Sequence, residues 1–448
     1  MEIEELKSKL RNYGVVGAGG AGFPTYAKLN MNADVVILNC AECEPLLRVD
    51  RQLSKYYTKN ILEALSLIVK TLKAEKGIFA IKSQYKEAIV SLHSIINKFS
   101  NIEIKILDNV YPAGDEVILV YETTGRIVPE GSIPISVGAV VINAETALNI
   151  FNAVFLNKPV IEKYVTVTGE VNSPLTIKVP IGTSIRECIE FSGSTSIKNF
   201  KIFNGGPMTG KIGDLEDVIT KTTKAIIVLP EDHSLILKKQ SKTSVKINRA
   251  MSVCSQCRMC TDLCPRYLLG HNIQPHRIMN ALANGLTLDI EAYTSSFLCS
   301  GCGICENYAC YQGLSPTAII GELKLRLKEK GIPNTHHNKT NKVNAMRSGR
   351  KVPMERLVAR LGLTKYNINA PLVDELFKTN KVFIKLKEHI GAPTISLVKV
   401  GDRVNLGDLI GGIEEGKLGA NIHASIAGII TNVDNKGITI EARGDINE

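Results

Sequence analysis

The first third of the chain alternates short apolar runs with longer segments of mixed polarity. The runs that predict strands lie at 35–39, 78–82, 102–108 and 139–142, and the segments that predict helices at 59–74, 86–99 and 114–124. Short β-rich runs that alternate with helical segments are typical of βαβ units, whose strands are parallel. We therefore predict an α/β domain with a largely parallel sheet over residues 1–157.

The pattern changes after this domain. Short strand-like runs separated by turn residues, with one helical segment at 184–191, predict a small β-rich domain over 158–240. A second β-rich pattern with Gly-Asp turn signals fills 379–448. Between the two lie a cysteine-rich segment at 248–330 and a basic stretch at 331–378, which we interpret as a linker. The fold class predicted is multidomain α/β.

Composition indicates how many domains the chain can form and in which compartment it works. The chain has 448 residues, of which 44% are hydrophobic and 22% charged, so it has room for about three domains. The most apolar stretch, 133–156, is interrupted by Asn143, Glu145, Asn149 and Asn152, which a membrane-spanning helix would not tolerate. The first residues carry alternating charges rather than the apolar core of a secretory signal. We expect a cytoplasmic protein without membrane insertion.

The net charge of +10 does not indicate nucleic-acid binding. Lys and Arg are spread along the whole chain, with one denser run at 339–360, and such runs are usually solvated surface. Trp is absent and aromatic residues make up 5%, so the stacking platforms that bind single strands are scarce.

Cysteine is the most informative residue type. Eleven cysteines in a reducing compartment indicate metal or redox chemistry rather than disulfides. Eight of them form two sets, the first C-x2-C-x2-C-x3-C-P and the second C-x2-C-x2-C-x4-C: Cys254, Cys257, Cys260 and Cys264; then Cys299, Cys302, Cys305 and Cys310. The first spacing is that of proteins with two [4Fe-4S] clusters, in which the fourth cysteine of each set binds the other cluster.

The predicted ligand sets are therefore crossed. One cluster takes Cys254, Cys257, Cys260 and Cys310, and the other takes Cys264, Cys299, Cys302 and Cys305. The alternatives are zinc, which prefers two separated C-x2-C pairs, and free thiols. The longer spacing before Cys310, and Tyr311 where proline is commoner, depart from the ferredoxin pattern. Cys40, Cys43 and Cys188 are interpreted as buried thiols.

A glycine-rich loop near the start can bring backbone N–H groups close to a phosphate. It reads GAGGAGFPTYAK over 17–28, and alone it is as compatible with a structural turn. The string resembles the flavin loop of the NADH-oxidising flavoprotein of respiratory complex I and of the RnfC protein of Rnf complexes. Three further strings resemble the same family and follow in its order: NCAECEP (39–45), YPAGDE (111–116) and NAET (143–146).

This resemblance implies roles for individual residues. Those that would cradle the phosphate and ribityl of FMN are Gly17, Gly19, Gly20, Gly22 and Lys28, helped by Asn39, Asn143 and Thr146. Those that would line the flavin and nicotinamide side are Glu42, Glu44, Tyr111, Asp115 and Glu116, with Glu44 and Glu116 as catalytic candidates. Ala18 stands where complex I proteins have arginine, and Asp115 replaces their first glutamate, so the departures from the family pattern concern nicotinamide recognition rather than flavin binding.

The resemblance covers nearly the whole chain. Residues 165–229 are similar to the β-grasp (SLBB) domain of that family, and the C-terminal residues to its barrel-sandwich domain. The order of these parts resembles the cobalamin reductases of propanediol-utilising bacterial microcompartments, and the Rnf-like protein associated with proline reductase is a close alternative. Lys417 occupies the place of a lipoyl lysine, but its flanking residues differ and we predict that it is unmodified.

The function implied is electron transfer from NADH through FMN and two [4Fe-4S] clusters to cobalamin. Expected partners are a corrinoid or a corrinoid adenosyltransferase, together with microcompartment shell proteins if the protein is enclosed there. A second hypothesis is an electron conduit for a larger complex, without a small-molecule acceptor of its own. A third is a non-redox protein, either a scaffold held together by zinc or a nucleic-acid binder built on the basic run 339–360.

Overall fold

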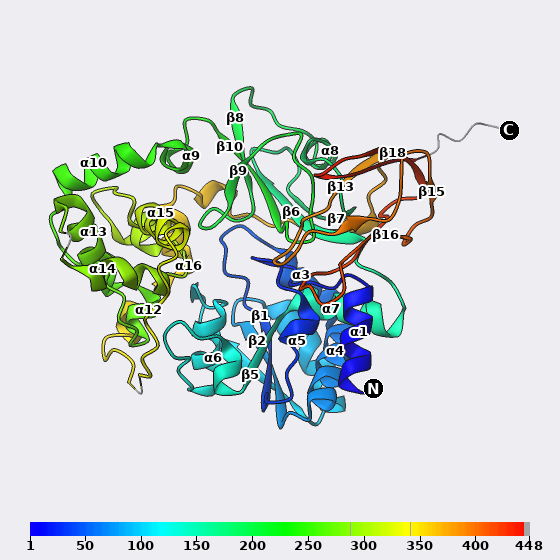
Figure 1. Cartoon of the computed structure of the whole chain (residues 1–448), viewed down its shortest axis with the longest axis horizontal. Coiled ribbons are helices and arrows are strands. Elements are labelled where there is room, and N and C mark those ends of the chain that lie inside the picture. Colours follow the sequence, from blue (N-terminus) through cyan, green and yellow to red (C-terminus); the bar gives the residue numbers. More distant parts are fainter. Residues whose placement is uncertain (287, 341, 443–448) are drawn as a thin grey trace.

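A four-stranded parallel sheet forms the centre of the first domain in the computed structural model, which describes residues 1–286, 288–340 and 342–442 (Figure 1). The strand order is β3-β2-β1-β5. The strands are β1 (Val35–Cys40), β2 (Lys76–Lys82), β3 (Ile102–Leu107) and β5 (Ala139–Asn143). All four predicted strands are present, with ends shifted by at most two residues, and every pairing is parallel as predicted.

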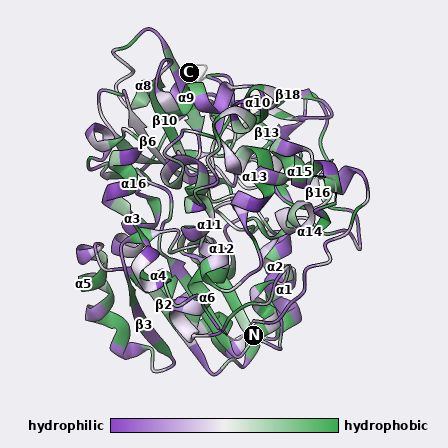
Figure 2. Ribbon diagram, turned by 90° about the vertical axis from the view of Figure 1, so that its left-hand side faces the viewer, coloured by the Kyte–Doolittle hydropathy of each residue, from purple (hydrophilic) through white to green (hydrophobic). Residues whose placement is uncertain are grey.

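Helices cover both faces of this sheet. Alternate residues of β1 face opposite sides: Val36 and Leu38 pack with α1, α3, α4, α5 and α7, whereas Val35 and Ile37 pack with α6. The helices are α1 (Ile3–Asn12), α2 (Thr25–Lys28), α3 (Val49–Tyr56), α4 (Thr58–Leu72), α5 (Lys86–Ile95), α6 (Glu116–Thr124) and α7 (Ala144–Phe155), with short turns η1 (Ile96–Lys98) and η2 (Pro134–Val137). In Figure 2, α5 alternates purple and green, as expected for a helix at the surface.

The second domain is built on a six-stranded sheet in the order β12-β7-β6-β10-β8-β9. Its elements are β6 (Glu162–Gly169), β7 (Leu175–Pro180), α8 (Ile185–Phe191), β8 (Phe200–Asn204), β9 (Lys211–Gly213) and β10 (Ala225–Pro230). The helix α8, as predicted, packs Ile185, Cys188 and Ile189 against the sheet. The edge strand β12 (Leu372–Leu376) comes from the stretch that the sequence indicated as a linker.

Helices dominate the cysteine-rich region, which lies beside α6 and opposite the C-terminal domain in Figure 1. They are α9 (Ser234–Gln240), α10 (Thr243–Val253), α11 (Met259–Asp262), α12 (Pro265–Leu268), α13 (Pro275–Asn284), α14 (Ile290–Thr294) and α15 (Pro316–Glu329), with shorter turns η3 (Ser295–Leu298) and η4 (Cys305–Ala309). Leu269 of this region is fully buried in the core under α6. The cluster region is therefore packed directly on the first domain.

The stretch 331–378 is part of the folded structure rather than a free tether. It carries η5 (Ser348–Arg350), β11 (Val352–Pro353), α16 (Met354–Arg360) and η6 (Thr364–Tyr366) before β12. β11 pairs with β4 (Val110–Tyr111) of the first domain. Arg347 and Lys351 form ion pairs with Glu122 of α6. Part of the basic run is thus neutralised inside the molecule.

The C-terminal domain is formed by two small sheets around one apolar core. Its strands are β13 (Lys381–Lys385), β14 (Ile395–Ser396), β15 (Arg403–Val404), β16 (Leu409–Gly412), β17 (Ile422–His423), β18 (Gly428–Val433) and β19 (Gly437–Glu441). The N–H of Ile390 donates to the carbonyl of Gly22 at 3.3 Å, so this domain contacts the glycine-rich loop. Lys417 is half exposed and pairs with Glu414. Across the described ranges, no helix combines the length and the apolar character that crossing a bilayer requires.

The most deeply buried ion pair between the first two domains is formed by Lys163 and Glu145. Lys163 lies in β6 and Glu145 in α7, and each side chain is only 1% exposed. The Lys163 ammonium also donates to the carbonyl of Ala18 at 2.8 Å, and Glu145 accepts the N–H of Tyr164 at 3.2 Å. Burial lowers the pKa of Lys163, so this ammonium depends on the carboxylate beside it.

We predict that Lys163→Met lowers the free energy of unfolding by about 3 kcal/mol or more, because it leaves the Glu145 carboxylate buried without its closest cation. Urea unfolding measures the effect. The matched control is Lys76→Met, which breaks the pair with Glu103 at the surface and should cost less than about 1 kcal/mol. Equal losses in the two variants would show that the buried pair does not hold the domains together.

Candidate flavin and iron–sulfur sites

The order of the parallel strands marks a ligand-binding edge. The chain moves from β1 to β2 and β3 on one side, then returns to place β5 on the other side of β1. In open α/β sheets ligands bind at the carboxyl ends of the strands where the order reverses. Asn39 and Asn143 are register partners at this edge, so two residues predicted for the flavin site lie side by side.

The glycine-rich loop is held over this edge by its neighbours. The N–H of Ala18 donates to the Thr146 hydroxyl at 2.9 Å, at the start of α7. Gly20 and Gly22 have φ of +77° and +67°, a left-handed conformation that favours glycine. In the described chain, the N–H groups of Gly19, Gly20 and Ala21 donate to no protein acceptor. Such free N–H groups suit a phosphate.

The turn at 111–116 closes the same edge. The Asn39 side chain donates to the Gly114 carbonyl at 2.8 Å, and a Cβ on Gly114 would lie 2.2 Å from the Ala41 carbonyl oxygen. Only glycine permits this approach. Lys28 and Glu116 form an ion pair of 2.5 Å. The predicted residues of the loop, the strand ends and the turn therefore come together, and they fit an FMN cradle.

Two predicted acidic residues differ in environment. Glu42 is buried, and one of its carboxylate oxygens has no hydrogen-bond partner among the described residues. Burial and the nearby Asp50 raise the pKa of Glu42 to about 7. Asp115 accepts the N–H groups of Val117 and Ile118 as the N-cap of α6, and its other oxygen pairs with Arg266 at 3.0 Å. Asp115 therefore positions the turn and the cluster region.

Glu44 has a contact that its sequence motif did not indicate. Its carboxylate accepts the N–H of Met208 at 2.8 Å and the N–H of Thr209 at 2.9 Å, both in the second domain. A Cβ on Gly206 would lie 2.2 Å from the Glu44 carboxyl carbon. The glycine turn of the second domain thus encloses Glu44, which joins the two domains in this structure.

Four of the predicted cluster cysteines line one small cavity. They are Cys264, Cys299, Cys302 and Cys305, which is the crossed set expected from the spacing. In the described chain, no three His, Cys, Asp or Glu side chains approach as closely as ligands of one metal ion do. A four-iron cluster holds its cysteine sulfurs farther apart than a single ion does. We call this set the near cluster site.

The other four cysteines are also brought together. Burial, together with smaller contributions from the neighbouring thiols of Cys257, Cys254 and Cys310, raises the pKa of Cys260 to about 12. Cys257 is exposed to solvent. Cys254, Cys257, Cys260 and Cys310 form the second set, which we call the far cluster site.

The near cluster site touches the flavin turn. The Tyr111 hydroxyl donates to the Cys302 carbonyl at 2.6 Å. The ion pair of Arg266 with Asp115 makes a second link, since Arg266 lies two residues after Cys264. Sequence spacing could not rank the two cluster sites by distance from the predicted flavin site, whereas these two contacts connect the near cluster site to the turn at 111–116.

Sequence reasoning missed the lysines that support the loop. Lys224 of the second domain pairs with Asp50 and donates to the Asn143 side chain at 3.3 Å. Burial opposes its charge, but the carboxylates of Asp50 and Glu145 raise the pKa of Lys224. The available signal was a lysine directly before an apolar strand run, as in KTTKAIIVL and EKYVTV, because a lysine that faces inward at such a place needs a buried partner.

Comparison with known proteins agrees with this geometry. Family models match in four places: the Nuo51 FMN-binding domain at 10–152, the SLBB domain at 164–211, the 4Fe-4S dicluster domain at 253–315 and the RnfC barrel sandwich hybrid domain at 361–444. Cobalamin reductase PduS of Salmonella typhimurium strain LT2 is 39% identical over 441 residues, covering 98% of this chain and 97% of that protein. The chain belongs to the PduS cobalamin reductase family.

Two further relatives are similar to this chain as well. PduS of Citrobacter freundii is 38% identical over 98% of this chain and 97% of its own length. One component of the Na+-translocating ferredoxin:NAD+ oxidoreductase complex of Acetobacterium woodii is 34% identical over 62% of each chain. The predictions of a multidomain α/β oxidoreductase with FMN and [4Fe-4S] cofactors are confirmed. The family resemblance drawn from the motifs is confirmed as well.

We predict that pairs of cysteine substitutions reveal the crossed ligands. The protein should bind about eight irons. Cys264→Ala with Cys299→Ala removes two ligands of one cluster and should leave about four irons, whereas Cys264→Ala with Cys254→Ala should leave almost none.

Iron and sulfide analysis after anaerobic purification measures these contents. Cys188→Ala, in the core of the second domain, is the control and should keep about eight irons. The opposite pattern in the two double variants would mean that each set binds its own cluster.

Proposed function

We propose that this chain oxidises NADH at FMN and passes single electrons through the near and then the far cluster site to a corrinoid. When bound, FMN takes up the hydride and the clusters carry one electron at a time, so that each NADH reduces two corrinoids by one electron each. The observation that supports this most directly is the contact of Tyr111 with Cys302, which links the flavin turn to the near cluster site. The cobalamin reductase name of the relatives supports the acceptor.

The residues of the chain would bind and orient the reactants. The free N–H groups at Gly19 and Gly20 would hold the FMN phosphate, and Lys28 would add its charge. Glu116 is partly exposed beside Lys28 and would contact the nicotinamide. Glu44 would act by holding the turn of the second domain against the site, because its carboxylate is already fully engaged there.

The resemblance also supports a location and a partner. We propose that the protein works within a bacterial microcompartment and supplies reduced corrinoid to an adenosyltransferase. Co-purification with shell proteins, against the same preparation from cells without a microcompartment, tests the location.

The function is tested with anaerobically purified protein that has been analysed for iron, sulfide and flavin. NADH should bleach the flavin and cluster absorbance, and cob(III)alamin should restore it while cob(II)alamin forms. A protein that is reduced by NADH and not reoxidised by corrinoids would be a conduit for another complex. A colourless protein without iron would contradict both hypotheses.

We predict that the two cluster sites work in series. In Cys257→Ala, which disturbs the far cluster site, NADH should still reduce the near cluster. In Cys299→Ala, NADH should leave the far cluster oxidised although dithionite reduces it. Electron paramagnetic resonance at low temperature distinguishes the two states, and reduction of the far cluster by NADH in Cys299→Ala would contradict this order.

A further inference from the structure

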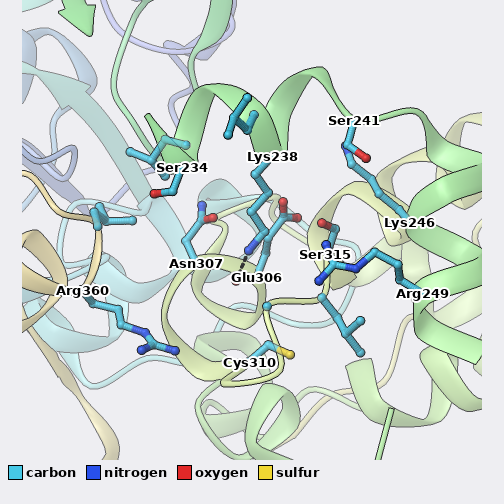
Figure 3. A pocket seen from close by; sticks show the side chains of 15 residues that line it. Ser234, Lys238, Ser241, Lys246, Arg249, Glu306, Asn307, Cys310, Ser315 and Arg360 are labelled. Atoms are coloured by element: carbon cyan, nitrogen blue, oxygen red, sulfur yellow. Dashed lines mark hydrogen bonds between the residues drawn. The ribbon is translucent and has the colours of Figure 1, made fainter. Parts of the chain in front are cut away.

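A basic pocket opens beside the far cluster site. It has a volume of about 510 Å³ and is lined by residues from α9, α10, the turn η4, the loop after Cys310 and the end of α16 (Figure 3). Cys310, a predicted ligand of the far cluster, is among the lining residues. The size is that of a small-molecule site.

Positive charge dominates the pocket. Its cations are Lys238, Lys246, Arg249 and Arg360, and the carboxylate among its lining residues is Glu306. Within the described residues, none of the four cations forms an ion pair. The Glu306 carboxylate already accepts the N–H of Ala318 at 3.0 Å.

The cations of the pocket lack the ion-pair partners that other basic residues of the described chain have. Two basic residues outside the pocket, Arg347 and Lys351, both pair with the carboxylate of Glu122 in α6. Lys238 instead donates to the backbone carbonyl of Glu306 at 2.6 Å, and burial lowers its pKa. An anion in the pocket would give this partly buried cation an ion-pair partner, which it does not have among the described residues.

The position of the pocket indicates which molecule would carry that anion. The near cluster site contacts the flavin turn, and the far cluster site is the one with an exposed cysteine, Cys257. On the proposed path, electrons leave the protein at the far cluster. A ligand in the pocket would therefore lie beside the point of exit, next to Cys310.

Resting on the proposed function, we propose that the pocket binds the phosphodiester-bearing nucleotide tail of the corrinoid acceptor and leaves the corrin ring outside, beside the far cluster. The phosphodiester is the only anionic group of cobalamin outside its metal-bound ring. Arg and Lys are the side chains that recognise such a group. The cavity suits the tail rather than the whole corrinoid, which is much larger.

Binding rather than turnover tests this inference. Isothermal titration calorimetry with the full, cluster-loaded protein compares hydroxocobalamin with cobinamide, a corrinoid that ends before the phosphodiester. We predict that Lys246→Gln with Arg249→Gln raises the Kd for hydroxocobalamin about tenfold relative to the Kd for cobinamide, as expected for lost charge-assisted contacts. The control is Lys242→Gln, a surface cation just before α10 that does not line the pocket, which should change neither value.

Each other result overturns the inference. Equal affinity of the unchanged protein for the two corrinoids would show that the tail is not recognised, and so would an equal loss for both in the double variant. Absence of binding of either corrinoid also excludes it. Reduction of cobalamin by NADH in the unchanged protein is measured separately, so a failure of the proposed function is seen apart from a failure of this pocket.

Discussion

Buried charges at the junction of the first two domains are the constraint on which the flavin site depends. Lys163 and Lys224 come from strands of the second domain or their ends, and Glu145 and Asp50 come from helices of the first. Each ion would be costly alone in this interior, so the charges are stable only when the domains are together. Because Lys163 also binds the Ala18 carbonyl, docking of the second domain fixes the glycine-rich loop.

Contacts between domains also connect the predicted flavin site to the cluster region. Asp115 ends its turn as the cap of α6 and at the same time pairs with Arg266 of the cluster region. Tyr111 donates to the loop that carries Cys302. A single turn of six residues therefore touches both the strand edge where the flavin would bind and the near cluster site. Any shift of this turn would change both sites together.

The sequence predicted those parts that depend on local pattern. The four parallel strands, α4, α5, α6 and α8 follow from apolar periodicity, and the two cysteine sets follow from spacing. The stretch 331–378 resembles a linker in sequence because its strands have only two and five residues, and such strands exist through their partners β4 and β7. The anchoring of Glu44 by residues more than 160 positions away likewise has no local signal.

Glycine near the start of the chain is required for reasons other than phosphate binding. The loop glycines are usually explained by a phosphate that needs free backbone N–H groups. Here a Cβ on Gly22 would lie 2.7 Å from Thr222 of the second domain and 3.2 Å from the Glu388 carbonyl oxygen of the C-terminal domain. A Cβ on Gly14 would lie 2.4 Å from the Asn421 carbonyl oxygen. Both residues also have positive φ. Glycine is thus required at these two positions by the close approach of the other domains, so the loop is shaped by the whole assembly, while the N–H groups of Gly19 and Gly20 remain open to a ligand.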